Sequence, residues 1–90
     1  MSDRAPRPDV DATAWKAWIA HVCAALEVDP ARVDVAAVHG LTGTIASRFT
    51  RPMAPVAAHL WGLAQGAHPD ADPLTLRDAI IASIPAGASA

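Results

Sequence analysis

The stretch that decides the fold is Arg48-Phe49-Thr50-Arg51-Pro52-Met53-Ala54-Pro55-Val56, followed by an apolar run from Ala57 to Ala67. Because the residue before a proline is disfavoured in the helical region, Ala54 favours a helix that begins at Pro55. Apolar residues then recur at helical spacing, at Val56, Leu60, Leu63 and Ala67. Residues 48–55, here called the interhelical segment, are therefore the predicted junction between two helices.

Two helices are predicted upstream of this segment. Asp34 suits the N-cap of a helix that runs to about Phe49, with a broad apolar face. Gly40 and Gly43 lie inside this helix, where each costs about 1 kcal/mol relative to alanine, so the helix is either continuous or broken in two. Asp11 precedes the other helix, at roughly residues 12–27, whose apolar stripe is Trp15, Trp18, Ile19, Val22 and Leu26.

Two Asp-Pro pairs supply further start signals, because proline is favoured at the first position of a helix. Asp29-Pro30 predicts either a short helical turn at 30–33 or the start of the second helix itself. Asp72-Pro73 opens a last helix that ends near Pro85. Its apolar residues are Leu76, Ile80, Ile81 and Ile84.

The predicted fold is therefore all-α, a small bundle of four helices with one extra short turn. No stretch alternates with period two, so no strand is expected. Short connections favour antiparallel neighbours. We expect a single helical domain at residues 12–85, between a disordered tail at 1–11 and a frayed tail at 86–90.

Composition limits the size of the core. The chain has 90 residues, and its hydrophobic fraction of 52% includes 22 alanines but only 4% aromatic residues. A chain of this size buries only about 60–65% of its unfolded surface, and alanine adds little area. This balance favours a domain that gains stability when it binds a partner.

Charge and targeting signals exclude several classes of protein. With a net charge of −2, the chain lacks the excess of basic residues that favours binding to nucleic acid or to an anionic membrane. No apolar run reaches the roughly 20 residues that span a bilayer, and residues 1–11 lack the apolar core of a secretory signal. Cys23 is the only cysteine, so an internal disulfide is impossible. We therefore expect a cytoplasmic protein without nucleic-acid or membrane partners.

Catalytic and metal-binding patterns are missing from the sequence. The four histidines, His21, His39, His59 and His68, form no metal-binding motif. The stretch from Gly40 to Thr44 is not a phosphate loop, because the only lysine is Lys16. We predict no catalytic residue, no metal, no cofactor and no enzymatic activity.

The sequence predicts residues for binding a partner more strongly than residues for catalysis. Trp61 projects about 120° from the centre of its helix's apolar stripe, and tryptophan is common at interface hot spots. The alternative is a core position beside Trp15 or Trp18. The predicted interaction surface combines Trp61 with the interhelical segment, through Arg48, Arg51, Pro52 and Pro55.

Two other binding sites are considered. Arg48, Arg51 and His59 could hold the phosphates of a nucleotide or pterin, whereas the two arginines could instead cap the preceding helix. The second helix also has a face of small residues that would let another backbone approach closely. That face consists of Ala36, Gly40, Gly43, Thr44 and Ser47.

Several motifs resemble a known family. They are a tryptophan-bearing first helix, Leu26-Glu27-Val28-Asp29 with Val33-Asp34, Arg51-Pro52-Met53-Ala54-Pro55, and the stretch from Leu60 to Gly66. Together they resemble a small bacterial helical domain family of unknown function, found alone or fused to molybdenum cofactor guanylyltransferase. The resemblance implies an accessory role in molybdenum cofactor biology and supplies no catalytic residues.

The leading functional prediction is a non-catalytic accessory or protein-interaction module. Its expected partner is a larger protein, either a molybdenum enzyme or a protein of cofactor biosynthesis. One alternative is a domain that binds a small ligand such as phosphate, a nucleotide or a pterin. Another is a structural subunit that associates with copies of itself into a homo-oligomer.

Overall fold

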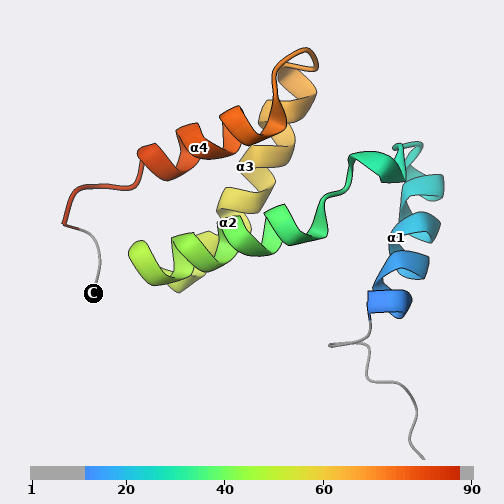
Figure 1. The fold of residues 1–90 in the computed structure, drawn as a ribbon, viewed down its shortest axis with the longest axis horizontal. Coiled ribbons are helices and arrows are strands. Elements are labelled where there is room, and N and C mark those ends of the chain that lie inside the picture. Colours follow the sequence, from blue (N-terminus) through green and yellow to red (C-terminus); the bar gives the residue numbers. More distant parts are fainter. Residues whose placement is uncertain (1–11, 88–90) are drawn as a thin grey trace, which may run out of the picture. The chain divides into compact units, whose positions relative to one another are not determined.

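The computed structural model describes residues 12–87, and within that range it is helical with no strand. Its elements are α1 (Ala12–Leu26), η1 (Pro30–Arg32), α2 (Val35–Arg48), η2 (Arg51–Met53), α3 (Ala54–Ala67) and α4 (Pro73–Ala82) (Figure 1). Here η1 and η2 are single 3-10 turns. The all-α prediction is confirmed.

Contacts divide the chain into two units, Met1–Asp34 and Val35–Ala90, and each is described by itself. The expected single domain at 12–85 stays a prediction. The predicted N-terminal tail, 1–11, lies outside the described residues, as do residues 88–90 of the predicted C-terminal tail.

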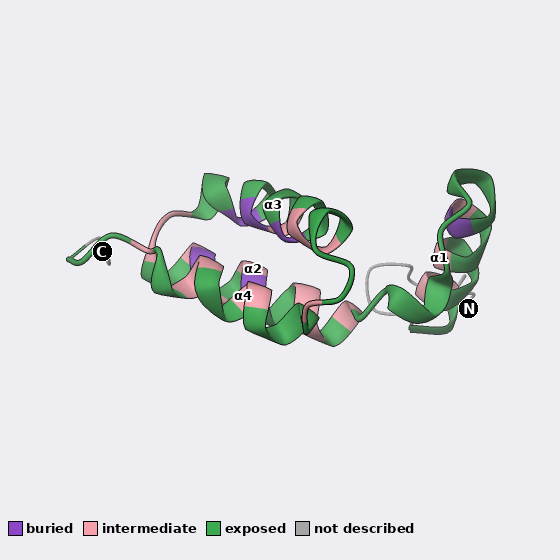
Figure 2. Ribbon diagram, turned by 90° about the horizontal axis from the view of Figure 1, so that it is seen from above, coloured by how far each residue is buried: buried purple, intermediate pink, exposed green. Residues whose placement is uncertain are grey.

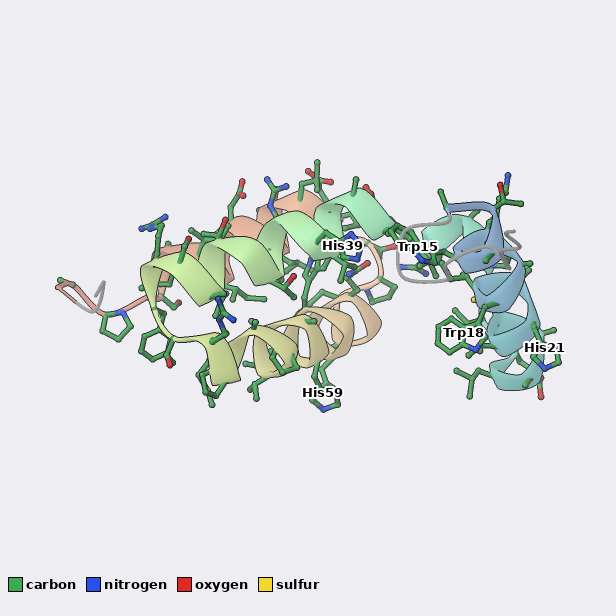
Figure 3. The ribbon with its side chains drawn as sticks, turned by 90° about the horizontal axis from the view of Figure 1, so that it is seen from below. Trp15, Trp18, His21, His39 and His59 are labelled. Carbon is green, nitrogen blue, oxygen red and sulfur yellow. The ribbon has the colours of Figure 1, made fainter. Side chains whose placement is uncertain are left out.

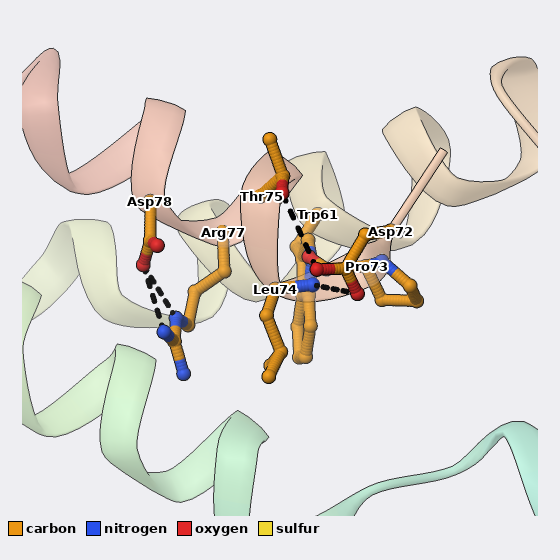
Figure 4. Close-up of polar contacts among 7 residues, drawn as sticks. All are labelled: Trp61, Asp72, Pro73, Leu74, Thr75, Arg77 and Asp78. Atoms are coloured by element: carbon orange, nitrogen blue, oxygen red, sulfur yellow. Dashed lines mark hydrogen bonds and ion pairs between the residues drawn. The ribbon is translucent and has the colours of Figure 1, made fainter.

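The helix starts follow from aspartate caps. Asp29 Oδ1 accepts a hydrogen bond from the backbone N–H of Ala31 at 2.9 Å, so Asp29-Pro30 opens the short turn η1 and not α2. α2 begins one residue after Asp34. Asp72 accepts hydrogen bonds from the Leu74 N–H at 3.4 Å and the Thr75 hydroxyl at 3.3 Å, which caps α4 (Figure 4).

The first unit contains α1 and η1, and α1 ends in a left-handed residue. Glu27 has φ 58°. The N–H of Val28 donates to the Cys23 carbonyl at 2.9 Å, and the N–H of Glu27 reaches the Ala24 carbonyl at 3.4 Å. This is the double hydrogen bond of a Schellman C-cap, with glutamate where glycine is the usual residue. Cys23 is buried in this unit.

The second unit packs α2, α3 and α4 around a small core. α2 supplies Leu41 and Ile45, and α3 supplies Ala54, Ala57 and Trp61 (Figure 2). The isoleucines of α4 pack against this cluster while staying partly exposed. Figure 2 shows that the buried sides of α2 and α3 face each other.

α2 is continuous through both of its glycines. A Cβ atom added at Gly40 or Gly43 would meet no side chain or neighbouring element within 4 Å. The small-residue face therefore receives no closely packed backbone within the described residues. The helix tolerates the two glycines, which is one of the two outcomes considered from the sequence.

The orientation of α3 differs from the expected one. Its predicted core stripe, Val56, Leu60 and Leu63, is 41%, 48% and 57% exposed. The buried positions are Ala54, Ala57 and Trp61, on another side of the helix. Two alanines let α3 lie close to α2, and the single large indole then fills the remaining volume. α3 also begins at Ala54, one residue before the predicted start, because η2 leads directly into it.

Candidate functional site: an apolar groove along α3

An open groove of about 160 Å³ lies within the second unit, between α2, α3 and α4. α2 and the residue after it contribute Ile45 and Phe49. The end of η2 contributes Met53, and α3 contributes Val56, Ala57 and Leu60. α4 contributes Ile80, and the segment after it contributes Ser83, Ile84 and Pro85. Among these described residues only Ser83 has a polar side chain. Its hydroxyl donates to the Ala79 carbonyl at 2.8 Å, within the same helical turn. The groove therefore presents an apolar wall.

A row of exposed apolar side chains continues the groove along α3. We call Met53, Val56, Leu60 and Leu63 the α3 apolar face. Their exposed fractions rise from 37% at Met53 to 57% at Leu63, and the first three also line the groove. A single exposed leucine is normal on a protein surface, but a row beside an apolar groove is typical of an interaction site.

The stretch of sequence that contains this face has acidic residues at none of its positions. Between Val35 and Pro69 the sequence contains no aspartate or glutamate, although the whole chain has a net charge of −2. Arg48 and Arg51 are exposed and precede the lining residues Phe49 and Met53 in the chain. The first turn of α3 also lacks an acidic residue, so the positive end of its helix dipole keeps its effect.

The arrangement gives the predicted phosphate site little support. Arg51 and His59 are both exposed. Figure 3 shows His59 projecting outward from α3. The groove lining includes none of Arg48, Arg51 and His59. The structure therefore does not gather these three basic side chains around one cavity.

Trp61 occupies the core position, not the surface position on which its predicted contact with a partner depends. Its side chain is 4% exposed, and its indole N–H donates to the Pro73 carbonyl at 2.8 Å. A side chain so enclosed has almost no surface to offer a partner. The other residues of the predicted interaction surface, Pro52 and Pro55 with the two arginines, are exposed.

Helical periodicity did not predict the groove, because it places the larger side chains of α3 in the core. One signal for the actual packing was present. Ala54 and Ala57 lie seven and four residues before Trp61, on the same side of the helix. Small residues one and two turns before a tryptophan indicate the side of a helix that another helix can approach closely.

Residues 12–87 contain no group of three or more His, Cys, Asp or Glu side chains placed to hold a metal ion. None of the helices in this part of the chain has the length and apolar character needed to cross a bilayer.

Comparison with known proteins identifies the family. Residues 10–89 match the model of a family described as Domain of unknown function (DUF6457), and the chain belongs to this family. No curated protein and no solved structure matches the chain.

Proposed function

We propose that this member of the DUF6457 family is a protein-interaction module without catalysis of its own. Its binding site is the groove together with the α3 apolar face. One observation supports this proposal above the others: α3 directs two alanines and a tryptophan inward and leaves its larger aliphatic side chains exposed beside a groove. A partner would bury apolar surface that folding of the second unit leaves in water, at about 25 cal/mol per Å².

The interhelical segment has a supporting role in this proposal. Arg51, Pro52 and Pro55 are exposed at the start of α3, close in sequence to the lining residue Met53. They would form a polar and rigid edge around the apolar centre, which is the usual anatomy of an interface. Trp61 would contribute indirectly, because its buried side chain holds α3 against α4 and does not contact the partner.

The sequence resemblance adds an identity for the partner. It supports a cytoplasmic complex with a molybdenum enzyme or with a protein that makes the molybdenum cofactor. Self-association is a second candidate, favoured by the regular spacing of the α3 apolar face. The small-ligand alternative gains no support from the lining, since none of the described residues in it is basic.

Site-specific crosslinking tests the proposal. A photoreactive amino acid at Leu60 should capture a defined protein in cells, whereas the same group at Leu74 should not. Leu74 is a matched control because it is 42% exposed, similar to the 48% of Leu60, but lies on α4 outside the groove lining. Leu60→Asp should abolish co-purification of the captured protein and Leu74→Asp should preserve it. Equal capture from both positions would contradict a binding site on α3.

A further inference from the structure

We propose that the partner presents an amphipathic helix whose apolar stripe is bordered by acidic residues. This inference rests on the proposed function, because it names what occupies the groove and the α3 apolar face. Its two parts, helical shape and acidic borders, depend on different observations.

The helical shape follows from the lack of hydrogen-bonding groups in the groove. A bound extended peptide would bury its own N–H and C=O groups, which need partners. Ser83 has the one polar side chain among the described lining residues, and its hydroxyl already donates to Ala79. Five of the ten lining residues lie in α2, α3 and α4. Of the other five, Pro85 has no N–H, and the N–H groups of the rest donate to backbone carbonyls of their own segments. A helix satisfies its own backbone and can therefore lie in such a groove.

The dimensions of the face also suit a helix. Met53, Val56, Leu60 and Leu63 follow one another at intervals of three, four and three residues. At 1.5 Å per residue they cover about 15 Å of α3. A partner helix of about three turns, with apolar residues at i, i+3, i+4 and i+7, would cover this length.

The acidic borders follow from charge complementarity. Arg51 is exposed at one end of the face, and the stretch from Val35 to Pro69 has no acidic side chain to oppose it. Of the three acidic residues farther along, Asp70 is exposed in the turn after α3, Asp72 caps α4, and Asp78 pairs with Arg77 at 2.8 Å. Acidic residues on a partner would meet positive potential there and find no competing carboxylate on α2 or α3.

The same charges argue against a second copy of this chain as the occupant. In a two-fold symmetric contact, each α3 apolar face would meet the identical face of the other copy. Neither face has a carboxylate to pair with Arg51. The Arg51 side chain of each copy would therefore either lack a partner or repel the Arg51 of the other copy. A different protein with acidic borders fits the face better.

Two synthetic helical peptides of about 18 residues provide the test. Both have leucines at the i, i+3, i+4 and i+7 positions, but one has glutamate beside the stripe and the other lysine. Binding to the full chain is measured by fluorescence anisotropy. We expect the glutamate peptide to bind about tenfold more tightly at low salt, with the difference shrinking at about 0.5 M salt.

Variants of the chain sharpen the result. Arg51→Glu should weaken the glutamate peptide about five- to tenfold. Arg77→Glu changes the net charge equally, but Arg77 pairs with Asp78 on α4 and does not belong to the groove lining, so this variant should have little effect. Leu60→Asp should abolish binding of both peptides.

The outcomes separate this inference from the proposed function. Equal affinity for both peptides, with loss of binding in Leu60→Asp, would overturn the acidic borders and leave the interaction module standing. A protein captured from Leu60 with no binding of either peptide would overturn the helical occupant. Self-association abolished by Leu60→Asp, measured by sedimentation, would make a second copy the occupant. Failure of capture and of peptide binding together would overturn both proposals.

Discussion

The indole N–H of Trp61 donates a hydrogen bond to the backbone carbonyl of Pro73 at 2.8 Å, joining α3 to the first residue of α4 (Figure 4). The contact spans the connection between the two helices and lies on the side of α3 that faces the core. It leaves Val56 and Leu60, which belong to another side of α3, as lining of the groove. Because the side of α3 that contains Trp61 faces the core, the α3 apolar face on another side of the helix stays exposed.

Replacement of Trp61 tests this arrangement. Trp61→Ala should lower the free energy of unfolding of the second unit by about 3–5 kcal/mol, because it removes a buried indole and its hydrogen bond. A small domain has only about 5 kcal/mol in total, so the variant should lose most of its helical signal in far-UV circular dichroism. Trp18→Ala is the control, since Trp18 is 66% exposed, and it should change stability by no more than about 0.5 kcal/mol. A well-folded Trp61→Ala variant would contradict the core role.

Helix boundaries were predictable from the sequence because they depend on local chemistry. Asp72 and Pro73 mark the start of α4 through a cap and a fixed φ angle, whatever the helix later packs against. The same reasoning placed the start of α2 after Asp34 and gave the short turn after Asp29 as one of two alternatives. Tertiary contacts were not needed for any of these predictions.

The orientation of α3 could not be predicted in the same way. Periodicity alone gave Val56, Leu60 and Leu63 as the buried stripe, because larger apolar side chains usually gain more from burial. The structure instead buries Ala54 and Ala57, which gain less area individually but permit close approach to α2. That choice depends on how closely the neighbouring helix approaches, so the stripe of larger side chains does not by itself determine which side of α3 is buried.

The cap of α4 gives a second test. Asp72→Ala should destabilise the second unit by about 1 kcal/mol, since it removes the acceptor for the Leu74 N–H and the Thr75 hydroxyl. Chemical denaturation followed by circular dichroism measures the change. Asp72→Ser should recover most of the loss, because serine also caps helices. An alanine variant as stable as the parent chain would show that solvent replaces the cap without cost.

The glycines of α2 offer stabilising substitutions. Gly40→Ala and Gly43→Ala should each raise the free energy of unfolding by about 0.5–1 kcal/mol, because alanine is the better helix former and the added methyl group meets open space. Thermal unfolding curves report the gain. Should either alanine weaken partner binding, the small-residue face of α2 would be a contact surface in the complex.

The left-handed cap of α1 predicts another gain. Glu27 adopts φ 58°, a conformation that costs an L-residue roughly 1–2 kcal/mol and that glycine adopts freely. Glycine loses about 0.5–1 kcal/mol of this advantage through its greater freedom when unfolded. Glu27→Gly should therefore stabilise α1 by about 0.5–1 kcal/mol, seen as a higher helical signal near the unfolding midpoint. Glu27→Val should do the opposite, because a β-branched residue is strained at positive φ.

A last comparison separates residues that support the fold from residues that await a partner. Leu41 is 1% exposed, so Leu41→Ala should cost about 2–5 kcal/mol of stability. Leu60 is 48% exposed, so Leu60→Ala should cost less than about 1 kcal/mol in the isolated chain. Denaturation of the chain alone and of its complex gives both values. In the complex, Leu60→Ala should become the more harmful of the two for affinity, since its side chain would then be enclosed. If Leu60→Ala destabilises the isolated chain as much as Leu41→Ala does, Leu60 belongs to the core and the α3 apolar face is not a binding surface.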